Sequence, residues 1–332
     1  MTFTPNTTYS WQIGYQAALN KVRSQLTHAP ENAPIRLAKK TSNLFRDRAA
    51  TQANGLAVSS FSSVFEVNPV NRTAEVGGMT TYEDLVAATL PYGLMPLCVP
   101  QLRTITLGGA VTGLGIESAS FRNGTPHESV LEMDILTGTG DVITVSGHEN
   151  DPHRDLFFTF PNSYGSLGYA LRLKIELEPT KPFVHITHLR FESAAALTVA
   201  LKDLSASAMF NESPINFLDG TVFSPTEHYL TVGTMVAAVP VGRNTSDYTG
   251  MSIYYRSIQS LAEDYLTIHD YLWRWDTDWF WCSRAFGAQH RIVRSLWPKS
   301  RLRSDVYWKI IAINRKLKLA EKLDTLKLKP PR

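Results

Sequence analysis

Alternating apolar and polar positions in the first half of the chain predict short strands joined by tight turns. The stretch LAVSSFSSVFEVNP (residues 56–69) alternates in this way, an Asn-Arg-Thr turn follows, and AEVGG (residues 74–78) returns. Because the side-chain period of a strand is two, these runs are expected to pair as a hairpin. The run SVLEMDILTGTGDVITVS (residues 129–146) predicts a second hairpin, with its turn at Thr139–Asp141.

Helical patterns occupy two segments of the same half. The first predicted helix runs from Trp11 to Leu26. The second lies in TTYEDLVAATLPYG (residues 80–93), where Thr80 or Thr81 is suited to cap the first turn and acidic residues follow the cap. Gly93 is expected to end this helix, since glycine readily adopts the left-handed conformation that closes helices.

Two prolines mark a boundary near the middle of the chain. Pro179 and Pro182 follow a strand that is predicted at residues 170–178. Beyond the prolines, strands are expected at residues 183–191, 216–225 and 228–240. A helix is expected at residues 193–210, between the first two of these strands. We therefore divide the chain into an N-terminal helical lead (1–30), a first domain (31–180) and a second domain (181–332).

The composition is that of a soluble globular protein, with 43% hydrophobic and 19% charged residues. No apolar run reaches the ~20 residues that span a bilayer, and the first residues lack the basic and then apolar pattern of a signal peptide. Cys98 and Cys282 are far apart, which favours reduced thiols in a cytosolic protein. The spacing of the histidines and cysteines predicts no metal site.

The net charge of +3 conceals an uneven distribution. Residues 291–332 hold 13 Lys and Arg against 3 Asp and Glu, a net charge of +10, so the rest of the chain carries −7. Six of the seven tryptophans lie between Trp273 and Trp308 in the same region. A solvated helix face is the simplest interpretation, and an acidic membrane surface or a nucleic acid are the alternatives.

A glycine-rich stretch, TITLGGAVTGLGIESASFRNG (residues 104–124), raises the question of a phosphate or cofactor loop. It lacks the Lys-Ser/Thr of a P-loop and the G-x-G-x-x-G order of a dinucleotide-binding turn. Gly108-Gly109 is open to two interpretations, a tight turn or one wall of a nucleotide site built from two loops. A polar, basic stretch from Arg36 through Lys39 to Asn43 would be the other wall.

The order of these parts resembles a known family. The residues that carry the resemblance are EVNPVNRTAEVGGMTTYEDLVAATLPYGLMPLCVPQLRTITLGGAV, GIESASFRNGTPHESVLEMDILTGTGDVI and DLFFTFPNSYGSLGYALRLKIE. From about Ile35 to Leu177 the chain resembles the PCMH-type FAD-binding domain of the para-cresol methylhydroxylase/vanillyl-alcohol oxidase superfamily. GIESASFRNG, DLFFTFPNSYGSLG, FLDGTVFSPTEHYLTVG and YLTIHDYLWRWDTDWFW look most like the Delta(24)-sterol reductase (Diminuto) branch. The implied fold class is α+β, a two-subdomain FAD-binding domain followed by an α+β substrate or cap domain that is C-terminally incomplete.

The resemblance implies which residues hold FAD. One pyrophosphate wall would come from Lys40, Thr41, Ser42 and Asn43. The other would present the backbone amides of Leu107, Gly108 and Gly109, with Thr104 and Thr106 nearby. The ribityl and ring region would lie along Gly113, Gly115, Ile116, Glu117 and Ser118, and the adenine side would be closed by Gly165, Leu167 and Gly168. The loop after Arg36 lacks the histidine that tethers flavin in many relatives, so FAD is expected to be non-covalent.

The resemblance also implies a reaction. Reduced flavin, with NADPH as reductant, would deliver hydride to the C=C bond of a sterol or similar apolar substrate. Tyr271, His269 and Asp276 are the candidate proton donors. The stretch YLWRWDTDWFWC would line an apolar slot with Arg274, Asp276 and Asp278 as polar handles, unless it is an amphipathic core patch.

Two other functions stay open at this point. One is an FAD-dependent oxidase or dehydrogenase of a hydroxylated substrate, and the other is an inactive flavin-binding remnant. The remnant is considered because members of the resembled branch continue well beyond KLDTLKLKPPR, where this chain ends. Basic and aromatic residues alternate from Arg284 to Lys329, which predicts a cytoplasmic protein with peripheral membrane contact. Nucleic acid is not an expected partner, because no recognised binding module accompanies the basic residues.

Overall fold

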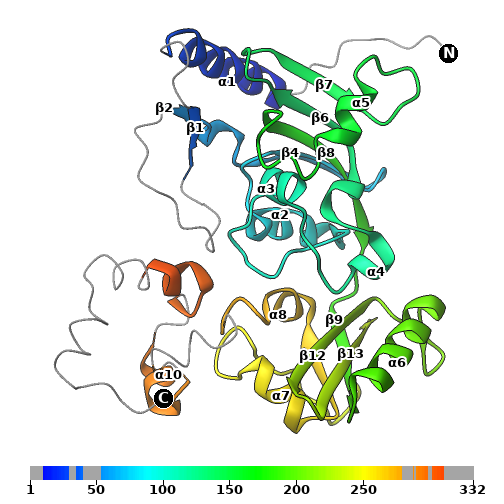
Figure 1. Ribbon diagram of the computed structural model, residues 1–332. Coiled ribbons are helices and arrows are strands. Elements are labelled where there is room, and N and C mark those ends of the chain that lie inside the picture. The colour runs from blue at the N-terminus through cyan, green and yellow to red at the C-terminus, as the bar shows by residue number, and fades with distance from the viewer. Residues whose placement is uncertain are drawn as a thin grey trace.

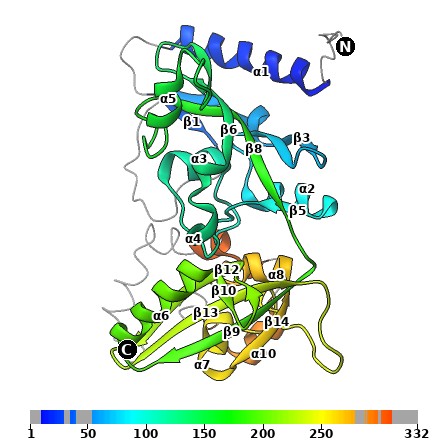
Figure 2. The ribbon, with the colours of Figure 1, turned by 90° about the vertical axis from the view of Figure 1, so that its right-hand side faces the viewer.

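Two antiparallel sheets organise the structure, which is a computed structural model that describes residues 10–29, 35–39, 54–278, 287, 289–297 and 301–309. The first sheet lies between helix α1 and helices α2 and α3, and the second lies below them in Figure 1. The chain passes from one sheet to the other between Pro179 and Phe183, as the long strand in Figure 2 shows. This mixture of helices and strands gives an α+β fold.

The first sheet has the strand order β3-β4-β8-β6-β7, and β5 pairs with the far end of β8. Its strands are β3 (Val64–Asn68), β4 (Thr73–Gly77), β5 (Leu94–Pro96), β6 (Val130–Leu136), β7 (Val142–Ser146) and β8 (Tyr169–Pro179). Both predicted hairpins are confirmed, since β3 pairs with β4 and β6 pairs with β7. The predicted strand at residues 170–178 is β8, which is longer by one residue at each end.

Helices cover both faces of this sheet. Helix α1 (Ser10–Thr27) lies on one face, and α2 (Tyr82–Thr89) and α3 (Leu107–Gly113) lie on the other (Figure 1). Thr81 is the N-cap of α2, because its hydroxyl oxygen accepts a hydrogen bond from the Asp84 amide at 3.2 Å. The short elements around the sheet are β1 (Ile35–Ala38), β2 (Asn54–Ala57), η1 (Ser59–Phe61), η2 (Leu90–Tyr92), α4 (Ser120–Asn123), η3 (Pro126–Ser129) and α5 (Arg154–Thr159).

The second sheet has the strand order β12-β13-β9-β14. Its strands are β9 (Phe183–Phe191), β12 (Phe217–Ser224), β13 (Glu227–Val236) and β14 (Glu263–Thr267). Around it lie α6 (Ala194–Ser207), α7 (Tyr254–Ser260), α8 (Ile268–Trp273), α10 (Arg291–Leu296) and the short pair β10 (Met209–Phe210) and β11 (Ser213–Pro214). The helix predicted to reach Phe210 ends earlier, because Ala208 turns to a φ of 50°. Among the described helices, none has the length and apolar character needed to cross a bilayer.

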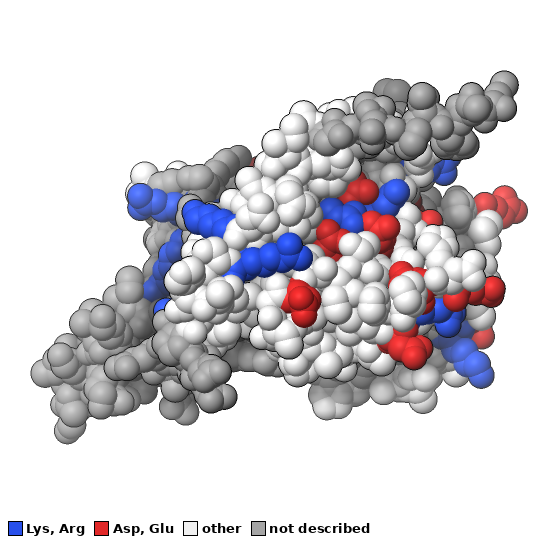
Figure 3. All heavy atoms as spheres, turned by 90° about the horizontal axis from the view of Figure 1, so that it is seen from above, with Lys and Arg blue, Asp and Glu red and all other residues white. Residues whose placement is uncertain are grey.

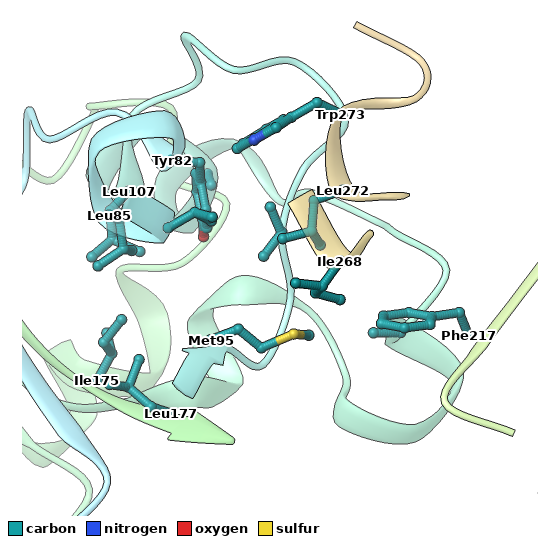
Figure 4. Packing of buried hydrophobic residues seen from close by; sticks show 14 of the residues in the cluster. Tyr82, Leu85, Met95, Leu107, Ile175, Leu177, Phe217, Ile268, Leu272 and Trp273 are labelled. Carbon is teal, nitrogen blue, oxygen red and sulfur yellow. The ribbon is translucent and has the colours of Figure 1, made fainter. Parts of the chain in front are cut away.

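One continuous buried cluster joins the two halves of the molecule. Figure 4 shows Met95 and Tyr82 of the first half facing Ile268, Leu272 and Trp273 of α8. All five side chains are at most 7% exposed. Because the interior is shared, the positions of residues from both halves are fixed relative to each other.

A polar groove of about 560 Å³ lies between α1 and the outer face of the first sheet. Arg172 stands at its base and contacts Glu75 at 2.7 Å, Asp134 at 2.8 Å and Glu132. Acidic and basic side chains gather together on this face of the molecule in Figure 3. The ion pairs of Arg172, which is in β8, thus connect this strand with its two neighbours, β4 and β6.

Candidate functional site

The first part of the glycine-rich stretch forms helix α3 rather than a loop. Thr106 caps the helix, and its hydroxyl oxygen accepts a hydrogen bond from the Gly109 amide at 3.3 Å. Leu107, Ala110 and Val111 are buried and anchor one side of the helix. Capping and the apolar stripe outweigh the low helix propensity of the glycines.

The predicted role of the α3 amides needs a correction. The Leu107 amide donates to the carbonyl of Thr80 at 2.9 Å, and the Gly108 amide donates to the carbonyl of Gly78 at 2.9 Å. A Cβ atom on Gly108 would lie 2.7 Å from that same Gly78 oxygen. These groups therefore hold α3 against the sheet, and they are not free to bind a pyrophosphate. Thr104 precedes the capped helix and is half-buried.

The second predicted glycine loop, residues 160–168, lies against the end of α3. The Asn162 amide donates to the carbonyl of Val111 at 3.2 Å, and the Tyr164 amide donates to the carbonyl of Thr112 at 3.0 Å. The segments that contain Gly113 and Gly165 are thereby brought together, although Gly113 was predicted for the ribityl and ring region of FAD and Gly165 for its adenine side. Gly168 lies farther along this loop, where a Cβ atom would meet the β6 backbone at 2.3 Å.

Three of the seven non-glycine residues with a positive φ in the described part of the chain lie where these two loops meet. Leu114 has a φ of 51°, Tyr164 of 50° and Asn162 of 60°. Bulky residues rarely adopt this left-handed conformation, which costs about 1–3 kcal/mol and is found most often at ligand sites.

Four exposed apolar side chains belong to the two segments that meet here, and we call them the platform: Leu114 (39% exposed), Ile116 (80%), Tyr164 (58%) and Leu167 (41%). The space next to Gly113 is open, because the nearest atom that an added Cβ would meet is in the Tyr164 ring, 4.0 Å away. Gly115 packs near the ring of Pro126 at 3.3 Å. An exposed apolar group beside an open glycine suits contact with a flat, largely apolar ring.

Strand β1, which precedes the other predicted wall in the sequence, lies next to the second loop. The Tyr169 hydroxyl donates to the Ile35 carbonyl at 3.4 Å, so β1 lies beside the end of the second loop. Arg36 is in this strand and Lys39 follows it. The other residues predicted for this wall, Lys40, Thr41, Ser42 and Asn43, lie outside the described residues.

Glu117 and Ser118 lead from the platform to the second half of the molecule. The amide and the hydroxyl of Ser118 both donate to Oε1 of Glu117 at 2.8 Å. The Ser118 Oγ lies 3.1 Å from the hydroxyl of Tyr271 in α8. Burial raises the pKa of Tyr271 well above its usual value, so this hydroxyl keeps its proton. Of the three predicted proton donors, Tyr271 is the one in contact with the glycine-rich stretch.

The other two predicted proton donors lie in different surroundings. Asp276 is fully buried, and one of its oxygens accepts from the Arg103 amide at 3.1 Å and the Ser304 hydroxyl at 2.5 Å. His269 is half-exposed, and its ring nitrogen lies 3.4 Å from Asp270. Burial raises the pKa of the Asp276 carboxyl, and its predicted role as a proton donor stays a prediction.

The tryptophan-rich segment also differs from its predicted role as a slot lining. Trp273 and Trp275 are at most 7% exposed and belong to the shared core. Arg274 and Asp278 are buried in ion pairs, with Asp219 at 2.6 Å and Arg294 at 2.7 Å respectively. The described part of the segment is thus a core patch, the alternative interpretation of its pattern. Trp279 and Trp281 lie outside the described residues.

Some site residues were not selected from the sequence. Leu114 and Tyr164 stand next to glycines that were selected, and a bulky residue inside a glycine-rich turn was an available signal. Asp219 lies in the apolar strand β12, where a lone acidic residue was the available signal. Its partner Arg274 is distant in sequence, so their pairing could not be anticipated.

The residues at this junction fit FAD in part. The platform and the open Gly113 suit a flat ring system, and the polar groups of Glu117 and Ser118 lie next to it. Arg36 of strand β1 and Lys39 just after it carry positive charge, which suits a pyrophosphate. The amides of Leu107 and Gly108 do not contribute, because they already donate to the carbonyls of Thr80 and Gly78.

Comparisons with known proteins agree with this assignment. Residues 19–146 match the family model described as FAD binding domain. A cytokinin dehydrogenase 7 of Oryza sativa subsp. japonica is 32% identical over 148 residues, which are 45% of this chain and 28% of that protein. Delta(24)-sterol reductases of Arabidopsis thaliana and Pisum sativum are 28% identical over 176 residues and 20% identical over 205 residues.

The match to these two reductases covers 52% and 60% of this chain, and 31% and 36% of the reductases themselves. The chain therefore spans about a third of the length of the curated relatives it matches. Residues 19–146 therefore carry an FAD-binding domain of the PCMH type, and about half of the chain is similar to Delta(24)-sterol reductases and cytokinin dehydrogenases.

Proposed function

We propose that this chain reduces the C=C bond of a sterol or a similar apolar small molecule, with non-covalent FAD as cofactor and NADPH as reductant. The observation that carries the proposal is the strained, exposed platform at the junction of the two predicted cofactor loops. The similarity to Delta(24)-sterol reductases over half of the chain supports the choice of reaction. FAD supplies the hydride chemistry of such a reaction when it is bound.

The chain's own residues would bind and orient the reactants. Ile116 and Tyr164 offer apolar surface to a ring, and Arg36 and Lys39 offer charge to phosphates. The hydroxyl of Tyr271 and that of Ser118 form a protonated pair at 3.1 Å, buried next to this surface. This pair is our candidate for holding the proton that the second carbon of the C=C bond requires.

Peripheral contact of a cytoplasmic protein with a membrane is part of the same proposal, because a sterol would be drawn from a membrane. Helix α10 exposes the apolar side chains of Ile292 (65%) and Leu296 (79%) beside the basic Arg291. An exposed apolar stripe flanked by basic residues suits the interface of an anionic bilayer.

A second candidate function is an FAD-dependent dehydrogenase or oxidase. The 32% identity to a cytokinin dehydrogenase supports it, since that similarity is as strong as the similarity to the sterol reductases. The same platform would serve both functions, and they differ in the direction of electron flow and in the electron partner.

The visible spectrum of the purified protein, before and after acid precipitation, tests the cofactor. A flavin spectrum that passes into the supernatant would support non-covalent FAD, and flavin that stays in the pellet would show a covalent tether. The absence of flavin binding even after FAD is added would refute the proposal and leave an inactive remnant.

The reaction is tested next under anaerobic conditions. NADPH should bleach the flavin, and a sterol with an unsaturated side chain should restore its colour, whereas the saturated sterol should not. Rapid recovery of the colour in air, or bleaching by a hydroxylated or amine substrate in place of NADPH, would favour the second candidate.

A further inference from the structure

The segment that carries Ile116 is fastened to the second half of the molecule. The Leu218 amide of β12 donates to the Ser118 carbonyl at 2.8 Å, and Phe121 packs against the cluster that contains Leu218. The Tyr271 hydroxyl contacts the Ser118 hydroxyl, as described above. The second sheet thus sets the position of the residues that follow the platform.

A buried charge cluster reinforces this attachment. Nη2 of Arg274 lies 2.6 Å from Oδ2 of Asp219 and 3.8 Å from Oε1 of Glu117. The guanidinium carbon of Arg274 lies 3.9 Å from the centroid of the Tyr271 ring. The side chain of Arg274 is 1% exposed and that of Glu117 is 6% exposed, so water does not screen their attraction.

The cluster leaves several buried polar atoms without hydrogen bonds. Within the described part of the chain, Oε2 of Glu117, Nε of Arg274 and Oδ1 of Asp219 have no hydrogen-bond partner. Buried polar groups are normally paired, because an unpaired one loses the hydrogen bonds that water would give it. Unpaired buried groups lower the free energy of unfolding, so stability alone does not account for the cluster. A role in positioning the Glu117 side chain does.

We propose that Arg274 is a positioning residue for the flavin, a proposal that rests on the proposed function. Arg274 holds Glu117, and Glu117 directly follows Ile116 of the platform. Through this contact the second sheet fixes residues 113–118 in the strained conformation that the flavin ring requires. Without the guanidinium, Glu117 and Asp219 would be two buried acidic groups with no cation between them, and the segment would be expected to move apart from β12.

Three substitutions test the proposal. Arg274→Met removes the charge, Arg274→Lys keeps it, and Arg190→Met makes the same change at an arginine that is 53% exposed on β9. Hydrogen exchange is measured on the apoprotein for residues 113–121, and the Kd for FAD is measured by fluorescence titration. We expect Arg274→Met to speed exchange in this segment and to raise the Kd about tenfold or more, a change of about 1.4 kcal/mol.

Arg274→Lys should keep the Kd within a few-fold of the parent value, and Arg190→Met should leave both measurements unchanged. A purely structural role would lower the unfolding temperature of Arg274→Met without changing the Kd of the folded fraction, and that result would overturn the proposal. Equal exchange in residues 113–121 for parent and Arg274→Met would also overturn it.

A fourth variant covers the case in which Arg274→Met does not fold. Glu117→Gln preserves the shape and removes the charge that Arg274 attracts, so faster exchange and weaker FAD binding are expected, and parental values of both would overturn the proposal. If the parent chain binds no FAD, the proposed function fails. The exchange measurement on the apoprotein then shows separately whether Arg274 orders the segment.

Discussion

Replacing Ile116 with alanine tests whether this side chain contacts the flavin or is an ordinary surface residue. The side chain is 80% exposed in the structure, so its loss should barely change the free energy of unfolding. Alanine lacks about three methyl or methylene groups, each worth ~0.8 kcal/mol when buried. If FAD covers the part that is now exposed, binding should weaken by about 2 kcal/mol, or about twenty- to thirtyfold in Kd.

The assay titrates the apoprotein with FAD and follows flavin fluorescence, and urea unfolding of the apoprotein gives the stability. Val70→Ala is the matched control, because Val70 is 90% exposed in the turn between β3 and β4, away from the platform. We expect the control to match the parent in both measurements. A Kd for Ile116→Ala within twofold of the parent value would refute the placement of the flavin on the platform.

Three further predictions concern stability and its dependence on pH. Arg172→Met leaves three carboxylates without their shared cation and should lower the free energy of unfolding by about 3 kcal/mol in urea titrations, whereas a loss below 1 kcal/mol would contradict a structural role for the cluster. Gly168→Ala, at a φ of 131° and with a backbone oxygen 2.3 Å from the new Cβ, should cost about 2–3 kcal/mol. Gly14→Ala in the open middle of α1 should instead add about 0.5–1 kcal/mol, and thermal unfolding that ranks these two variants the other way would exclude the geometric explanation. Burial acts to raise the pKa of Glu83, but the hydrogen bonds and charge of Arg303 outweigh it and keep the pKa below its usual value. The parent should therefore be more stable than Glu83→Gln by about 1 kcal/mol at pH 7. This difference in the free energy of unfolding should vanish as the pH falls through the lowered pKa of Glu83. A difference that grows on acidification would show the reasoning to be wrong.

The sequence predicted the elements whose causes are local. The hairpin turn at Thr139–Asp141, a cap at Thr80 or Thr81 and the long strand before Pro179 each depend on residues within a few positions of one another. The recognition of an FAD-binding domain was likewise possible from contiguous motifs. These signals do not require knowledge of how distant segments meet.

Local evidence was misleading where tertiary packing decided the outcome. Gly108-Gly109 was compatible with a turn or a cofactor wall, but it begins a helix because Gly108 fits against the Gly78 backbone on the sheet. Trp273 and Trp275 were expected around a slot, but the docking of the two halves buries them in the shared core. Neither packing partner is near in sequence, so periodicity could not reveal it.

The sequence by itself determined that this protein has an α+β fold with an FAD-binding domain, because strand alternation, caps and motif order are properties of neighbouring residues. Only the tertiary structure decided which amides are already occupied, which apolar side chains form the platform, and that Glu117 meets Arg274. The physical reason is that burial, close backbone approach and unscreened charge pairing arise when segments that are distant in sequence, from about 30 to more than 150 residues apart, pack together.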